Sequence, residues 1–384
     1  MRYRGLNTGS TASFLAGFLF TLSFATGLSQ DPVLKTRPKE DPDAQSNAKH
    51  RITMNVQVTD SVGNPVSDLR AEDFTLYDNN QQRRIAAFRS IDGQALNDAT
   101  QILMLLDAVN TPAAALEEEK TAIFKYLAEG HKPLSFPTAF ALWFNGHLSA
   151  TPATTDRNAI GRAFVKLTKT VHSNACGGGS DGAEQKVTIN KKAETVDPAT
   201  CRAVHFKDSI SALDGIAQQQ LSTGRRTLLI WMGSGWPTLS STDLQRLTPK
   251  QQHDYAREFA TIFHDLRAAQ ITVYSLTPEK RNLNKDLAGN LGSTQASGSA
   301  STGHLPRLAV DELAERTGGR AIGASSELTA DLHRCIRDAQ WYYMFSFNAP
   351  PAQSVTGEMH SLAVKVNRPG VEVRAMDRYY TEPR

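Results

Sequence analysis

The sequence predicts an α/β protein in which a mostly parallel central sheet is covered by helices on both faces. Between residues 98 and 340, apolar runs of strand length alternate with amphipathic helical stretches. This order is typical of parallel strands joined by helical crossovers. Alternating strand patterns occupy residues 51–95 and 341–384, on either side of this region. A second, β-sandwich-like unit is therefore expected from the two ends.

Continuous apolar runs identify the strands of the central sheet, because parallel strands buried on both faces lack alternation. These runs are Ile102–Leu106, Thr138–Phe144, Thr227–Met232 and Ile271–Leu276, followed by a short strand at Ala321-Ile322. Helical periodicity between them predicts six helices. The predicted helices are Pro112–Glu129, Asp156–Thr168, Lys207–Leu221, Thr248–Ala269, Leu308–Thr317 and Leu328–Ala339.

The flanking segments show the period of half-buried strands. Ile52, Met54, Val56 and Val58 alternate with polar residues, which predicts one apolar face. A hairpin is expected from Phe74–Tyr77 through the turn Asp78–Gln81 to a return strand at Ile85–Phe88. Because chain termini often lie close together, we expect the N-terminal strands to pair with the C-terminal ones. The C-terminal strands are predicted at Tyr342–Phe347, Ser361–Val366 and Val371–Ala375.

The N-terminus has the composition of a secretory signal peptide. Arg2 and Arg4 form a basic region, and the apolar run Phe14–Ala25 precedes small residues. We therefore expect a signal peptide at 1–29 and a disordered linker at 30–50. An uncleaved anchor is the alternative, but the apolar run is shorter than the roughly 20 residues of a membrane span. The expected location is periplasmic or extracellular, with no membrane span after signal removal.

The composition is that of a globular protein and argues against a general attraction to nucleic acid. Of 384 residues, 40% are hydrophobic and 21% are charged, as in an ordinary folded domain. The formal net charge is +3, and it falls to +1 without the two arginines of the signal peptide. Nucleic-acid-binding domains usually gather more positive charge. The expected partner is another protein or an extracellular ligand.

The chain contains three cysteines, and an exported protein could join two of them in a disulfide. Cys176 and Cys201 flank a polar, glycine-rich insertion at 172–205, whereas Cys335 lies in a helical pattern. We expect the bond Cys176–Cys201, with Cys335 as a buried free thiol and the insertion as a surface loop. Three reduced thiols are the alternative. No Cys-x-x-Cys or His-x-x-x-His spacing accompanies the cysteines, so zinc is not predicted.

Seven stretches carry a family resemblance by their order and spacing: Val56–Val66, Leu69–Thr75, Asp107–Thr111, Ala212–Ile216, Gly224–Pro237, Leu313–Gly319 and Tyr342-Tyr343. Together they resemble exported von Willebrand factor A-related proteins of the acidobacterial type. The resemblance covers about residues 51–380 and implies a Rossmann-like von Willebrand factor A domain, export, and a binding rather than catalytic role.

This resemblance implies a metal-ion-dependent adhesion site, which binds Mg²⁺ through oxygen ligands and whose first loop reads Asp-x-Ser-x-Ser. Here the loop reads Asp107-x-Val109-x-Thr111, so Asp107 is kept, Thr111 stands for the second serine, and Val109 has no side-chain oxygen. The sequence therefore predicts a degenerate site, with no cofactor expected and Mg²⁺ as an alternative.

The second and third loops match the metal-site motif even less well than the first loop does. Asp208 and Ser209 are the candidates for the second loop, and Gly233-Ser234 stands where the third loop normally carries an aspartate. A purely structural interpretation accounts for the first loop as well. Thr111 would be a helix N-cap before a proline, and Asp107 would accept backbone N–H groups. A metal-independent ligand pocket at the same edge is the third interpretation.

Open α/β sheets bind ligands at the carboxyl ends of their strands, so we predict a partner-binding rim there. Its candidate residues are Asn110, Trp236 and Pro237. Trp236 is attractive because tryptophan is enriched at binding hot spots. The alternative is that this side chain folds back over the helix layer.

Two other function classes stay open. Ser234 on a strand-to-helix turn resembles a hydrolase nucleophile elbow, Gly-x-Ser-x-Gly, but Met232 takes the place of the first glycine. A hydrolase using Ser234 or carboxylates at the rim is one alternative to a binding module. A structural component of a cell-envelope assembly is the other.

Overall fold

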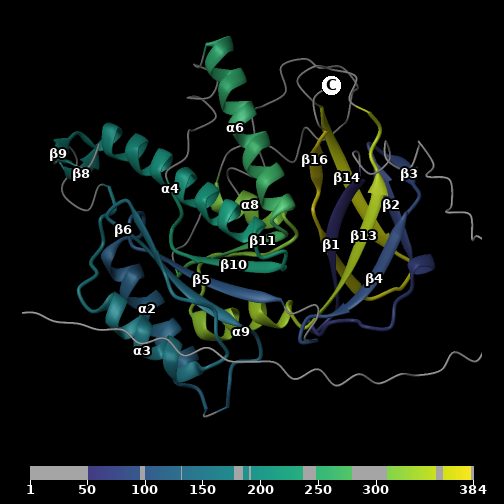
Figure 1. Ribbon diagram of the computed structural model, residues 1–384, viewed down its shortest axis with the longest axis horizontal. Coiled ribbons are helices and arrows are strands. Elements are labelled where there is room, and N and C mark those ends of the chain that lie inside the picture. Colours follow the sequence, from purple (N-terminus) through teal and green to yellow (C-terminus); the bar gives the residue numbers. More distant parts are fainter. Residues whose placement is uncertain are drawn as a thin grey trace, which may run out of the picture. The chain divides into compact units, whose positions relative to one another are not determined.

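The structure is a computed structural model that describes residues 51–95, 100–130, 132–176, 185–189, 192–236, 248–278, 309–351 and 358–381. The segments predicted as signal peptide and linker lie outside the described residues. The described residues belong to one compact unit. It contains a six-stranded mixed sheet with helices on both faces and two four-stranded antiparallel sheets (Figure 1), which confirms the α/β class.

The six-stranded sheet has the order β12-β11-β10-β5-β6-β7. All neighbouring pairs are parallel except β6 with β7, which is antiparallel. The inner strands are buried along almost their whole length, which is why their sequences are continuous apolar runs. The strands are β5 (Gln101–Asp107), β6 (Thr138–Phe144), β7 (His147–Ala150), β10 (Thr227–Met232), β11 (Ile271–Leu276) and β12 (Ala321–Ile322).

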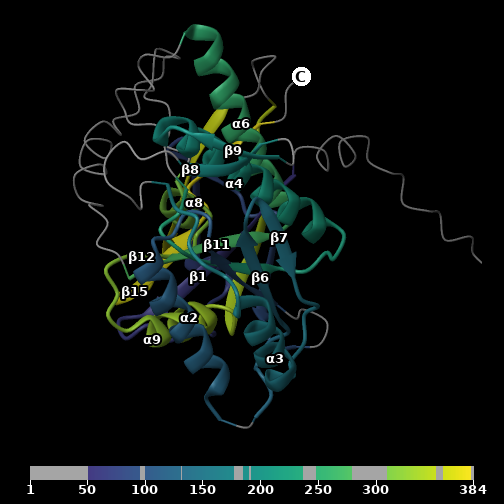
Figure 2. The same ribbon diagram turned by 90° about the vertical axis from the view of Figure 1, so that its left-hand side faces the viewer.

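Helices cover both faces of this sheet (Figures 1 and 2). One face packs against α4 (Pro198–Leu221), α6 (Pro249–Ala268) and α8 (Val310–Arg316). The other packs against α2 (Ala113–Ala128), α3 (Arg157–Thr168) and α9 (Leu328–Arg337). Each helix contributes an apolar stripe, and one fully buried Leu or Ile side chain stabilises the fold by about 1.5–3 kcal/mol.

Strands from the two ends of the described chain form the two antiparallel sheets, with the orders β15-β1-β13-β4 and β16-β14-β2-β3. Their facing sides share one core, in which the ring of Phe74 meets that of Phe345 edge-on at 4.8 Å between centroids. The strands are β1 (Arg51–Asp60), β2 (Phe74–Asp78), β3 (Gln81–Arg83), β4 (Ala87–Asp92), β13 (Trp341–Asn348), β14 (Met359–Val366), β15 (Val371–Ala375) and β16 (Arg378–Tyr380).

Three sequence predictions are wrong, for the first hairpin, for the insertion and for the start of the helix that follows it. The return strand of the first hairpin is β3, whereas Ala87–Asp92 pairs with β13 in the other sheet. The insertion is not a plain surface loop, because it contains the hairpin β8 (Gln185–Ile189) and β9 (Lys192–Val196). The following helix begins at Pro198 rather than Lys207, since nothing in its first turns interrupts the helix.

The outer face of β1 is covered by the α/β part, which is why Gln57 and Thr59 are buried although they alternate with the apolar residues. Gln57 Nε2 donates to the carbonyl of Asp338 at 2.6 Å. The Asp338 carboxylate is 2% exposed and pairs with Arg320 at 3.1 Å and with Arg374 of β15 at 2.8 Å. A buried ion cluster therefore connects the two parts of the fold.

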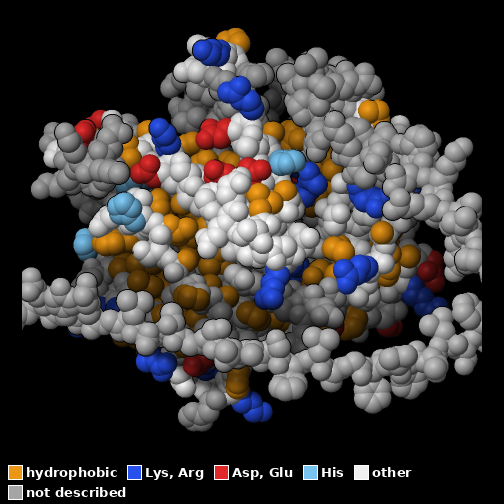
Figure 3. All heavy atoms as spheres, viewed as in Figure 1, with side chains coloured by type: hydrophobic (Ala, Val, Ile, Leu, Met, Phe, Trp, Pro, Cys, Tyr) orange, Lys and Arg blue, Asp and Glu red, His pale blue; other side chains and the backbone are white. Residues whose placement is uncertain are grey.

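None of the helices described here has the length and apolar composition of a membrane span. On the face shown in Figure 3, Lys and Arg side chains are spread over several elements rather than gathered over one.

Candidate functional site

The first candidate site lies at the carboxyl edge of the six-stranded sheet. β5 ends at Asp107, the next strand in the sheet carries Trp231, and α4 supplies Ser209. All three side chains are fully buried. The structure thus brings together residues from three segments that are far apart in the sequence.

The Asp107 carboxylate accepts four hydrogen bonds from nitrogen donors. Oδ1 accepts from the backbone N–H groups of Val109 at 3.1 Å and Asn110 at 3.0 Å. Oδ2 accepts from Asn110 Nδ2 at 2.8 Å and from Trp231 Nε1 at 3.0 Å. Burial raises the pKa of Asp107 to about 6 from its ordinary value of 3.8, and these bonds oppose the rise.

Asn110 links the first loop to α4. Its Nδ2 group donates to both Asp107 Oδ2 and Ser209 Oγ, the latter at 3.0 Å. A neutral amide therefore bridges an acidic oxygen and a hydroxyl oxygen. Asn110 Oδ1 is buried and has no hydrogen-bond partner among the described residues. Asn110 is thus an internal connector rather than an exposed rim residue.

Thr111 is not the helix N-cap that the sequence predicted. The N-cap residue of α2 is Pro112, which makes no side-chain cap bond. The Thr111 hydroxyl instead accepts from the Ser234 backbone N–H at 3.2 Å, which joins the first loop to the loop after β10. This contact positions Ser234 through its backbone, and Ser234 itself is half-buried.

The third loop has no space for an acidic side chain at its first position. Gly233 has φ +153°, and a Cβ atom there would lie 2.7 Å from both Asp107 Cβ and Thr111 Oγ1. Backbone of this kind favours glycine. The residue following β10 is therefore restricted to glycine by sterics.

The residues present do not fit a Mg²⁺ site in this arrangement. An ionised carboxylate offers about four acceptor positions, and N–H donors use all four on Asp107. Val109 contributes no oxygen and is 2% exposed. Mg²⁺ requires near-octahedral oxygen ligation, which these side chains do not supply.

Of the remaining predicted residues, one lies in the apolar core, one lies near a neighbouring turn, and one lies outside the described residues. Trp236 is 4% exposed and packs edge-on against Trp231, with ring centroids 5.0 Å apart. The prediction of an exposed aromatic at the rim is therefore wrong, because this ring completes the apolar core. Asp208 is half-buried and lies near the turn at Gly146. Pro237 lies outside the described residues.

Protonation of Asp107 is expected to be visible in tryptophan fluorescence. Because the folded pKa lies above the unfolded value, the group stabilises the protein most below about pH 4, and this contribution is lost as the pH rises through about 6. We expect a fluorescence transition centred near pH 6, since Trp231 donates to this carboxylate. Trp231→Phe should remove the transition, and Trp341→Phe, in the β unit, should preserve it. A transition that survives Trp231→Phe would contradict this assignment.

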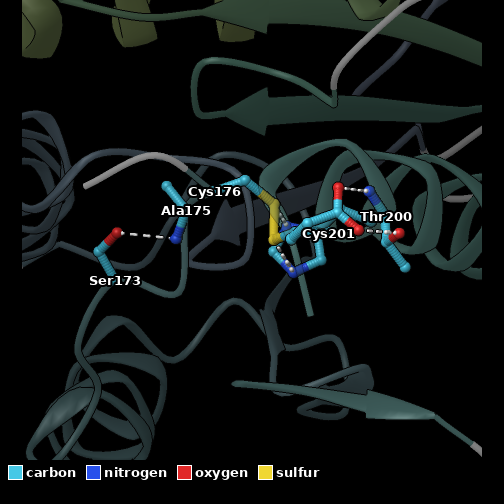
Figure 4. Close-up of a disulfide and its surroundings, with 7 residues drawn as sticks. Ser173, Ala175, Cys176, Thr200 and Cys201 are labelled. Atoms are coloured by element: carbon cyan, nitrogen blue, oxygen red, sulfur yellow. Dashed lines mark hydrogen bonds between the residues drawn. A yellow bond between two sulfur atoms is a disulfide. The ribbon is translucent and has the colours of Figure 1, made fainter. Parts of the chain in front are cut away.

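Cys176 and Cys201, the pair that the sequence favoured, are joined by a disulfide, and Cys335 is a buried free thiol. The bond connects the segment after α3 to the first turn of α4 (Figure 4). His205, one helical turn after Cys201, is 6% exposed and faces the two sulfur atoms.

A second candidate site is a cavity of about 540 Å³ between the α/β part and the β sheets. Three arginines line it, two of them from α9. Arg320 is held by Asp338, and Arg334 pairs with Asp331 at 3.1 Å. Arg337 has no ion pair within the described part of the chain. The full lining is Asp60, Ser61, Val62, Gly63, Arg320, Arg334, Arg337, Gly370, Val371 and Glu372.

The acidic residues of this cavity are already engaged. The Asp60 carboxylate accepts from the backbone N–H groups of Val62 and Asn64 in its own turn, and these bonds lower its pKa. Glu372 pairs with Arg320 at 3.6 Å and with Arg374 at 3.3 Å. Sequence reasoning missed this site because the only local signal is the spacing of Arg334 and Arg337 on one helix.

The fold and these sites define an α/β protein with a mixed six-stranded sheet and an attached pair of antiparallel sheets. No family model and no curated protein matches the chain. Among solved structures, the chain is similar to the human COPII-coat protein Sec24c, with 9% identity and a TM-score of 0.32. The match covers 77% of this chain and 46% of that one, so the chain spans less than half the length of the protein it matches.

Proposed function

We propose that the protein is an exported binding module of the von Willebrand factor A-related type, and that it takes a small anionic ligand in the arginine-lined cavity. The observation that carries the proposal is the convergence of Arg320, Arg334 and Arg337 on one cavity of ligand size. Guanidinium groups bind carboxylate and phosphate oxygens in a bidentate manner. A ligand with two or more such groups fits this chemistry.

The arginines differ in how firmly they are held, which supports a binding role. Arg320 has a side chain that is 17% exposed and is anchored by Asp338, so it is preorganised. Arg334 is more than half exposed at its side chain, and Arg337 is half-buried. A ligand that completes the bonds of Arg334 and Arg337 gains charge-assisted hydrogen bonds of about 1.5–3 kcal/mol each.

Calorimetric titration of the purified protein with citrate and with pyrophosphate tests this proposal. We expect saturable heat with at least one of these anions. Arg337→Ala and Arg334→Ala should each weaken binding by about tenfold or more, because each removes a charged hydrogen-bonding partner. Arg162→Ala, exposed on α3, is the matched control and should bind as the wild type does. The absence of saturable heat, or equal affinities in all variants, would refute the proposal.

The same instrument separates this function from metal-dependent adhesion at the strand edge. With Mg²⁺ or Mn²⁺ we expect no saturable heat, since the Asp107 oxygens are already used by nitrogen donors. Heat that saturates in the wild type and vanishes in Asp107→Ala would instead support a working, cation-dependent adhesion site.

A further inference from the structure

The region around the disulfide contains the donor atoms of a metal site. Taking one ligand atom from each of Cys176, Cys201 and His205, these atoms all lie within 4.8 Å of one another. His205 Nδ1 is 3.2 Å from Cys176 Sγ, and His205 Nε2 is 3.9 Å from Cys201 Sγ. Sequence analysis paired the two cysteines, which are 25 residues apart, but it did not place His205 beside them.

We propose that reduction of this disulfide creates a binding site for one thiophilic divalent cation such as Zn²⁺. Its ligands would be Cys176, Cys201 and His205. Thiolate sulfur and imidazole nitrogen are the ligands that Zn²⁺ prefers, and three protein ligands with a solvent molecule in fourth position form a known arrangement. The oxidised and metal-bound forms would be two states of the same three side chains.

The observed geometry is close to what such a site needs. In a tetrahedral site with Zn–S of about 2.3 Å and Zn–N of about 2.0 Å, sulfur and nitrogen ligands are about 3.5 Å apart. His205 supplies one nitrogen to the cation. Its Nδ1 atom, 3.2 Å from Cys176 Sγ, is already near this separation, and one ligand atom from each of the three residues lies within 4.8 Å of the other two. Cys201 and His205 are four residues apart on α4 and therefore share one face of the helix. The main change required is separation of the two sulfur atoms.

An external dithiol is the reductant that opens the Cys176–Cys201 disulfide, and with it the atoms and electrons of the reaction balance. A thiolate of the dithiol attacks the sulfur of Cys176, the less buried of the two cysteine residues, and the bond to Cys201 breaks with the electron pair leaving on Cys201. The second thiol of the reductant then releases Cys176. The protein gains two electrons and two protons, and the reductant becomes a disulfide. Binding of the cation to both thiolates and to neutral His205 then releases the two protons.

Cobalt spectroscopy on the full chain tests the proposal, because Co²⁺ substitutes for Zn²⁺ and reports its ligands. The protein is reduced with dithiothreitol, freed of it without oxygen, and titrated with Co²⁺. We expect thiolate-to-cobalt charge-transfer bands and tetrahedral d–d bands that saturate at one equivalent in the reduced protein and are absent in the oxidised protein. His205→Gln should weaken binding by at least about tenfold. Cys335→Ala, which changes the third cysteine, should leave the bands unchanged.

Reduced protein that keeps its far-ultraviolet circular dichroism but shows no bands would overturn the proposal. Bands that persist at equal affinity in His205→Gln, or that vanish in Cys335→Ala, would overturn it as well. If His205→Gln does not fold, alkylation of the reduced wild type decides the matter. Zn²⁺ should then protect Cys176 and Cys201 from alkylation, as mapped by mass spectrometry, and equal alkylation with and without Zn²⁺ would refute the site.

Discussion

Replacing Asp338 by alanine is expected to lower the free energy of unfolding by about 3–5 kcal/mol, because it leaves buried positive charges without their partner. The carboxylate pairs with Arg320 and Arg374, whose side chains are 17% and 12% exposed. Tyr274 also donates to it, at 3.1 Å. Urea denaturation followed by circular dichroism measures the change, and a loss below about 1 kcal/mol would contradict it.

Glu372→Gln is the matched control for this prediction, because Glu372 pairs with the same two arginines. Its side chain is 55% exposed, and exposed ion pairs contribute only about 0–1 kcal/mol. We therefore expect a small change in the free energy of unfolding for Glu372→Gln. Similar losses in both variants would mean that burial does not control the strength of this cluster.

Gly233→Ala is expected to cost about 2–4 kcal/mol, through strained backbone and overpacking together. The new Cβ would lie 2.7 Å from Asp107 Cβ and Thr111 Oγ1, so the first loop would have to move. The hydrogen bond from the Ser234 N–H to the Thr111 hydroxyl should weaken with it. Equilibrium unfolding in urea measures the loss.

Gly161→Ala is the matched control for Gly233→Ala, and it should stabilise the protein rather than destabilise it. Gly161 lies within α3, and a Cβ there would meet no atom within 4 Å. Alanine is the better helix former by about 1 kcal/mol, so we expect the free energy of unfolding to rise slightly. A loss at Gly161 equal to that at Gly233 would show that the close contact at Gly233 is not what restricts this position.

Local sequence patterns were sufficient for most of the secondary structure. The strand at Val371–Ala375 has the predicted bounds, and α2, α3 and α6 agree to within one residue at each end. The starts of these helices carry local signals, since Pro112 precedes α2, Asp156 caps α3 and Pro249 begins α6. The start of α4 was placed too late, because residues up to 205 were assigned to the glycine-rich insertion, although the helix begins at Pro198.

Local sequence patterns could not show which sheet a predicted strand joins. The alternation in Ala87–Asp92 shows that a strand is present, but not which strand it joins. It pairs with β13, more than 240 residues later in the sequence. In the same way, β14 and β15 are consecutive in the chain but belong to different sheets. Partner choice depends on which apolar faces meet, and that is a property of the assembled core.

The candidate sites show the same difference between what local sequence determines and what the tertiary structure decides. By itself, the sequence determined that a carboxylate ends a buried strand before a helix, and it identified Ser209 and Ser234 as residues near that end. Only the tertiary structure decided that Asp107 is saturated by N–H donors, that Trp236 is buried, and that Arg320 and Arg337 share a cavity. Residue type and spacing report what a segment can do locally. The number of donors around a carboxylate, or the charges around a cavity, depends on residues that folding brings together from distant segments.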